Sequence, residues 1–143
     1  MALIEFKNKP NTDTPINDDN LNHNFKELDE RTNYSTEEKV VGTWINGKPL
    51  YRKSITFTST ISSNSLMTKA HNISNVDFIR IKEFILSETT GTTYSLPLVG
   101  YSGNLTDKTY AYVNKNNIYA YSNGGWGAAW TKIVVLEYTK TTD

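Results

Sequence analysis

The chain has 143 residues, which is enough for one domain with a single core and a small appendage but not for two full domains. Its 15 basic and 15 acidic residues balance, so no overall charge attracts nucleic acid or an anionic membrane. It contains no cysteine, which excludes disulfides, thiolate metal sites and a cysteine nucleophile.

The first predicted element is a helix within the segment TPINDDNLNHNFKELDERTNY. Leu21, Phe25 and Leu28 recur at helical spacing, which places them in one narrow apolar stripe. A helix of about four turns is marginal alone in water, and nothing else in this segment covers the stripe. The stripe therefore predicts packing either on the body of the chain or on copies of itself.

The composition changes after Tyr34 to short β-type runs separated by turn residues. This change predicts an N-terminal arm and oligomerisation helix over residues 1–35 and a β-domain over residues 36–143.

The β-domain opens with VVGTWINGKPLYRKSITF, residues 40–57, in which Asn46 and Gly47 favour a two-residue hairpin turn. In that register Trp44 lies opposite Pro49, and the basic residues after the turn point to solvent. Aromatic and proline packing alone can hold such a turn. We therefore interpret this motif as a structural hairpin rather than a binding site.

A second hairpin is predicted in KTYAYVNKNNIYAYSN, with Tyr110 and Tyr112 on one arm and Tyr119 and Tyr121 on the other. Together with the runs around it, about seven strands follow one another without a helical pattern between them. The sequence therefore predicts a mainly β fold, an antiparallel jelly-roll-like β-sandwich preceded by a short N-terminal α-helix. A small antiparallel barrel is the alternative.

Residues with catalytic chemistry are scattered. No Gly-x-Ser-x-Gly motif is present, and no histidine or carboxylate cluster has metal-ligand spacing, so no catalytic residue, cofactor or metal is expected. His71, in a loop-like segment, is predicted at the surface. The acids in or beside predicted strands are expected to be solvated, although a pair that met in space would suit glycoside hydrolysis; these acids are Glu83, Glu88, Asp107 and Glu137.

Aromatic residues make up 12% of the chain, and several gather in IYAYSNGGWGAAW. Trp126 lies among glycines there, where no regular strand is expected to bury it. We predict that Tyr119, Tyr121, Asn123 and Trp126 contact a glycan. The alternatives are ordinary strand and core roles for these aromatics, or a contact of Trp126 with a neighbouring subunit.

Three segments carry a family resemblance: NTDTPINDDNLNHNFKELDE, YSTEEKVVGTWINGKPLYRK and VVLEYTKTTD. They resemble segments of tail-tip, baseplate and tail-fibre proteins from phages and prophages of Gram-positive bacteria. The middle of the chain, residues 59–130, carries no such motif.

The resemblance implies a non-enzymatic component of the virion tail, made in the host cytoplasm and usually homotrimeric. Its β-module would face other tail or baseplate proteins or the host surface, where cell-wall polysaccharide is the expected ligand. No signal peptide or membrane span is expected, because the longest apolar run is IVVL. An accessory baseplate protein without receptor binding and a glycan-cleaving tail enzyme remain the alternatives.

Overall fold

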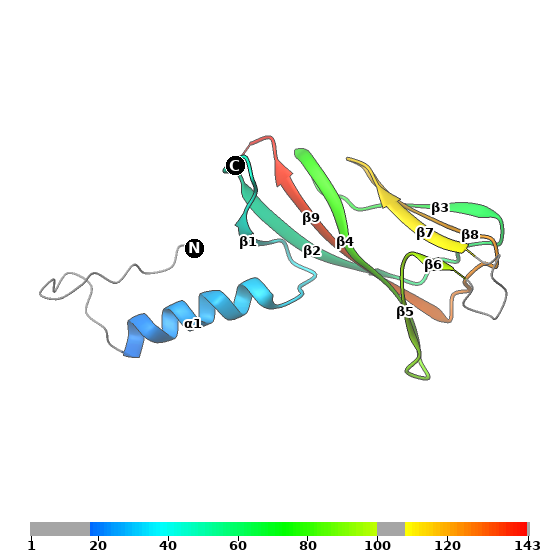
Figure 1. The fold of residues 1–143 in the computed structure, drawn as a ribbon, viewed down its shortest axis with the longest axis horizontal. Helices are drawn as coiled ribbons and strands as arrows, with labels where there is room; N and C mark the ends of the chain where they lie inside the picture. Colours follow the sequence, from blue (N-terminus) through cyan, green and yellow to red (C-terminus); the bar gives the residue numbers. More distant parts are fainter. Residues whose placement is uncertain (1–17, 100–107, 143) are drawn as a thin grey trace, which may run out of the picture. The chain divides into compact units, whose positions relative to one another are not determined.

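A computed structural model describes residues 18–99 and 108–142. The chain divides into two compact units, Met1–Asn33 and Tyr34–Asp143. Helix α1, Asp18–Thr32, belongs to the first unit (Figure 1). Its predicted stripe is exposed, with Phe25 exposed by 65%. No helix in the described ranges is both long and apolar enough to cross a bilayer.

The second unit contains two antiparallel sheets, coloured from cyan to red along the chain in Figure 1. The larger sheet has the order β1-β2-β9-β4-β5, so β9 lies between β2 and β4. Its strands are β1 Lys39–Thr43, β2 Pro49–Phe57, β4 Val76–Glu88, β5 Thr93–Ser95 and β9 Trp130–Lys140.

The smaller sheet has the order β3-β8-β7-β6, so the chain leaves the larger sheet after β2 and after β5 and returns to it for β4 and β9. Its strands are β3 Ser65–Ala70, β6 Leu98–Val99, β7 Lys108–Val113 and β8 Asn117–Ser122.

Both sheets contribute to one hydrophobic core. Phe84 and Leu136 come from the larger sheet, and Met67, Ile118 and Ala120 come from the smaller one. The predicted mainly β fold with a short N-terminal helix is therefore confirmed. The jelly-roll-like sandwich packing remains a prediction.

A β-bulge in β4 changes which residues face the core. The register between β4 and β9 shifts between Ile81 and Glu83. Ile79 and Ile81 pack against the core before the shift, whereas Phe84 and Leu86 are buried after it. One extra residue in a strand reverses the facing of every later side chain, which explains this change.

The first hairpin differs from its prediction in the turn. Gly47 N–H donates to the Trp44 carbonyl at 2.9 Å, and Trp44 N–H donates to the Lys48 carbonyl at 2.8 Å. The strand register pairs Thr43 with Pro49. The loop therefore has three residues, ending on Gly47 at φ +84°, and the prediction of a two-residue turn was wrong.

The side chains around this hairpin also differ from their prediction. The Trp44 ring stacks on Phe78 of β4 at a centroid distance of 4.6 Å, because Phe78 offers an aromatic face and Pro49 has none. Lys48 Nζ lies 2.6 Å from Asp77, and the Arg52 guanidinium lies 2.7 Å from Glu137. These basic side chains hold the sheet together and do not simply point to solvent.

Candidate functional site

The predicted hairpin between β7 and β8 is present and carries two stacked tyrosine pairs. Tyr110 lies opposite Tyr121, and Tyr112 lies opposite Tyr119. The ring centroids are 5.2 Å apart in the first pair and 4.7 Å apart in the second, with interplanar angles of 28° and 12°. Residues two apart on a strand share a face, so both pairs lie on the same side of the sheet.

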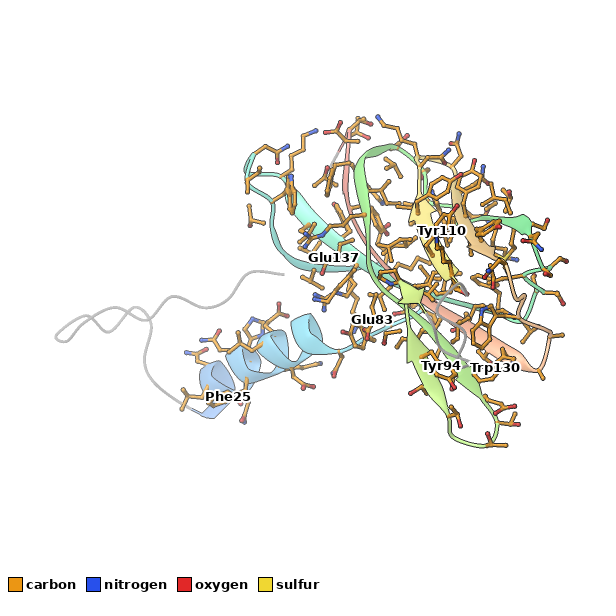
Figure 2. All side chains as sticks on the ribbon, turned by 45° about the vertical axis from the view of Figure 1, so that its right-hand side comes forward. Phe25, Glu83, Tyr94, Tyr110, Trp130 and Glu137 are labelled. Atoms are coloured by element: carbon orange, nitrogen blue, oxygen red, sulfur yellow. The ribbon has the colours of Figure 1, made fainter. Side chains whose placement is uncertain are left out.

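This side is the outward side of the smaller sheet, because the alternating residues Thr109, Ile118 and Ala120 are buried. Figure 2 labels Tyr110 on β7. On the neighbouring strand β3, Leu66 lies opposite Tyr121 and Thr68 lies opposite Tyr119, so each tyrosine pair continues into a row of three side chains across the sheet. We call this surface the tyrosine face; its residues are Leu66, Thr68, Lys108, Tyr110, Tyr112, Asn117, Tyr119 and Tyr121.

The hydroxyl groups divide the four tyrosines into two kinds. On β8, Tyr119 Oη accepts from Asn114 Nδ2 at 3.2 Å, and Tyr121 Oη donates to Asn64 Oδ1 at 3.3 Å. On β7, Tyr110 and Tyr112 are exposed by 44% and 46%. Their hydroxyls make no hydrogen bond to any described residue.

The β7 tyrosines are therefore more available to a ligand than the β8 tyrosines that the sequence suggested. From the sequence alone, Tyr110 and Tyr112 are predicted only as cross-strand partners of the β8 tyrosines. The alternation in KTYAYV already placed them on one face, and this signal could have identified them.

Asn123 lies at one end of the tyrosine face. Its Oδ1 accepts from the Lys108 backbone N–H at 2.7 Å, and its own N–H donates to the Lys108 carbonyl at 3.2 Å. The structure therefore places Asn123 beside Lys108, at one end of the tyrosine face.

Trp126 does not belong to this surface, and the expectation that it is exposed was wrong. Its side chain is only 5% exposed. The indole Nε1–H donates to Thr109 Oγ1 at 2.9 Å, and the ring meets Trp130 at a centroid distance of 4.8 Å. Trp126 and Ile61 also exchange two backbone hydrogen bonds, of 2.7 and 2.9 Å. This pairing turns the glycine loop inward and places the indole in the core.

His71 is buried, which contradicts its predicted surface position. Its Nδ1 accepts from the Ile73 N–H at 3.1 Å, and its Nε2–H donates to the Asn114 carbonyl, also at 3.1 Å. Both ring nitrogens are therefore engaged. The imidazole ties the segment after β3 to the turn between β7 and β8.

Glu137 on β9 is also buried, at 2% exposed, although it was expected to be solvated. Its carboxylate accepts hydrogen bonds from Arg52 at 2.7 Å and Arg80 at 2.6 Å, and Lys82 Nζ lies 3.6 Å away. Burial alone would raise the pKa of this carboxyl, but the hydrogen bonds from Arg52 and Arg80 outweigh burial and hold the pKa below its usual value. Such a group is a poor proton donor and is better suited to joining strands.

Two of the other candidate acids lie in different surroundings. Glu88 accepts a hydrogen bond from the Thr90 hydroxyl at 2.7 Å. Glu83 borders a hollow of about 260 Å³ whose lining also includes Ile85, Ile133 and Val135. Asp107 lies outside the described residues. Among the residues that the structure describes, no group of three or more His, Cys, Asp or Glu could hold a metal ion.

Comparisons with known proteins give no family for this chain. No protein-family model, curated protein or solved structure matches it. Its function is therefore inferred from its own residues and from the resemblance of its terminal motifs.

Proposed function

We propose that this protein is a non-enzymatic component of a phage tail or baseplate. In this proposal its β unit binds cell-wall polysaccharide of the bacterial host, and the protein assembles as a homotrimer. The tyrosine face is the observation that carries the binding role, and the phage-like terminal motifs supply the location.

The tyrosine face has the composition that a sugar requires. Aromatic rings offer apolar surface to the C–H groups of a pyranose, and amides and hydroxyls can bond its hydroxyl groups. Tyr110 and Tyr112 supply the first kind of contact, together with two hydroxyls that no described residue engages. Asn117 and Asn123 supply amides at the two ends of the rows.

The exposed stripe of α1 supports the trimer. Leu21, Phe25 and Leu28 are all exposed, and burying them between copies would remove apolar surface from water at roughly 25 cal/mol per Å². A short stripe at helical spacing is well suited to a small parallel bundle.

One observation favours the accessory baseplate role without receptor binding. Ile45, in the loop between β1 and β2, is 93% exposed. A large aliphatic side chain at the tip of a hairpin suits a protein partner better than a sugar. Both roles are compatible with the same virion location.

The binding role predicts that Tyr112→Ala abolishes adsorption to isolated Gram-positive cell walls. The fold should survive, because loss of one cross-strand pair costs only about 0.2–1 kcal/mol. A pull-down of protein with cell walls, followed by thermal melting of the unbound protein, measures both effects.

Tyr34→Ala is the matched control, since Tyr34 is an exposed tyrosine outside the tyrosine face. It should adsorb like the wild type. Wild-type adsorption by both Tyr110→Ala and Tyr112→Ala, with both variants folded, would contradict the proposed site.

If the protein assembles as proposed, the wild type should sediment as a trimer. The Phe25→Asp variant should sediment as a smaller species. Charge in the stripe opposes its burial, whereas the β unit has its own core and should keep its far-UV β signal. A wild-type protein that sediments as a 16.2 kDa monomer at micromolar concentration would refute the trimer.

A further inference from the structure

We propose that the tyrosine face selects a polysaccharide that carries negative charge along its chain. This inference rests on the proposed binding role and adds the chemical class of the ligand. It follows from the distribution of charge over the smaller sheet and from the position of Lys108.

The smaller sheet is built from acid-free sequence. No Asp or Glu occurs in residues 58–76 or in residues 108–136. These two stretches supply β3, β7, β8 and the turn between β7 and β8. They contain lysines, among them Lys69, Lys108 and Lys115, while the chain as a whole has a formal charge of zero. Positive charge therefore gathers on this sheet and negative charge elsewhere.

The described strands of this surface, β3, β7 and β8, carry lysines and no carboxylate, so the surface treats ligands unequally. An anionic polymer that approaches these strands meets no like charge on them, and the lysines raise its local concentration. A cationic ligand finds no counter-charge there. Among the polysaccharides that tyrosines and amides can hold, those with negative charge gain most from this surface.

Lys108 places one such charge on the tyrosine face itself. Lys108, Tyr110 and Tyr112 are exposed and alternate with the buried Thr109 and the half-buried Ala111, so the three share the outward side of β7. From Lys108 to Tyr112 the strand covers about 13 Å. A single sugar chain along β7 can therefore meet the rings and the ammonium group together.

The Lys108 ammonium group has no hydrogen-bond or ion-pair partner within the described part of the chain. Several other lysines of the β unit are paired, among them Lys48 with Asp77 and Lys140 with Glu38. Lys115, in the turn at the other end of β7, has part of its charge offset by Asp77. Lys108 is therefore the lysine best placed to contact an anionic ligand.

The test measures binding of the full chain to three immobilised polymers: poly(glycerol phosphate), polygalacturonate and neutral dextran. We expect binding to an anionic polymer that weakens as salt rises, because the Debye length falls from about 8 Å at 0.15 M to about 3 Å at 1 M ionic strength. Lys108→Gln should lower affinity for that polymer about two- to fivefold. The control Lys26→Gln, an exposed lysine on α1, should bind like the wild type.

A preference for poly(glycerol phosphate) would show that the ligand carries its negative charge on phosphodiesters. A preference for polygalacturonate would show that it carries the charge on carboxylates. Either result supports the inference. Salt-independent binding to dextran or to cell walls, unchanged in Lys108→Gln, would overturn it and leave the proposed function intact. Failure to bind any polymer or cell wall would instead overturn the proposed function. A Tyr112→Ala variant with altered sedimentation and unaltered binding would identify the tyrosine face as a protein contact and refute both.

Discussion

We expect Trp126→Ala to lower the free energy of unfolding of the β unit by about 3–5 kcal/mol, the usual cost of truncating a buried tryptophan. The indole fills the core between the rings of Trp130 and Tyr94, and alanine would leave a cavity there. The substitution also removes the hydrogen bond to Thr109. Urea denaturation followed by far-UV circular dichroism measures this loss.

Trp126→Phe separates the two contributions. Phenylalanine keeps one six-membered ring in the core but loses the five-membered ring with its N–H donor, so we expect a smaller loss of about 1–2 kcal/mol. Thr109 would keep its hydrogen bond to the Ser122 hydroxyl. If Trp126→Ala unfolds at the wild-type urea concentration, the side chain is not buried in solution, and a surface role for it becomes tenable again.

The second large effect is expected at Glu137. Because the folded pKa of this carboxyl lies below its ordinary value of 4.5, the ionised form stabilises the folded state. That stabilisation is present above pH 4.5 and is lost as the pH falls through the lower, folded pKa. The wild-type free energy of unfolding should therefore decrease on acidification below about pH 4.5.

Glu137→Gln should remove much of this acid sensitivity and lower stability at pH 7 by about 3 kcal/mol, the lower end of the range for breaking a buried ion pair. Chemical denaturation between neutral pH and pH 3 gives both quantities. Glu88→Gln is the control, with an expected loss below about 0.5 kcal/mol. Parallel pH profiles for the wild type and Glu137→Gln would show that another group causes the acid sensitivity.

The parts of the fold that sequence predicts well are those set by neighbours along the chain. The β7–β8 hairpin follows from alternating tyrosines on either side of Asn114 and Asn117, and the structure reproduces it. The bulge in β4 has no such local signal, because it depends on how β9 pairs with Ile81 and Glu83. The first turn was missed for a different reason, because Asn-Gly sequences suit more than one hairpin loop.

The candidate site was predictable only in part. Tyr119, Tyr121 and Asn123 were predicted from the sequence and lie on or beside the tyrosine face, but the hydroxyl partner of Tyr121 is Asn64, which comes from a distant segment. Which tyrosines stay available therefore depends on tertiary contacts.

The burial of Trp126 and Glu137 depends on distant partners as well. Trp126 pairs with Ile61, and Glu137 is held by arginines on two other strands. Residue type alone favours the surface for a glutamate and for a tryptophan between glycines. Only the assembled sheet reverses that preference.

The position of β9 between β2 and β4 also governs biosynthesis. Both neighbours precede β9 in the chain, so the ribosome releases them before their shared partner exists. Until residues 130–140 leave the exit tunnel, β2 and β4 present unpaired backbone edges that can join other nascent chains. The larger sheet can therefore close only late, once residues 130–140 have left the exit tunnel and β9 can pair with both β2 and β4.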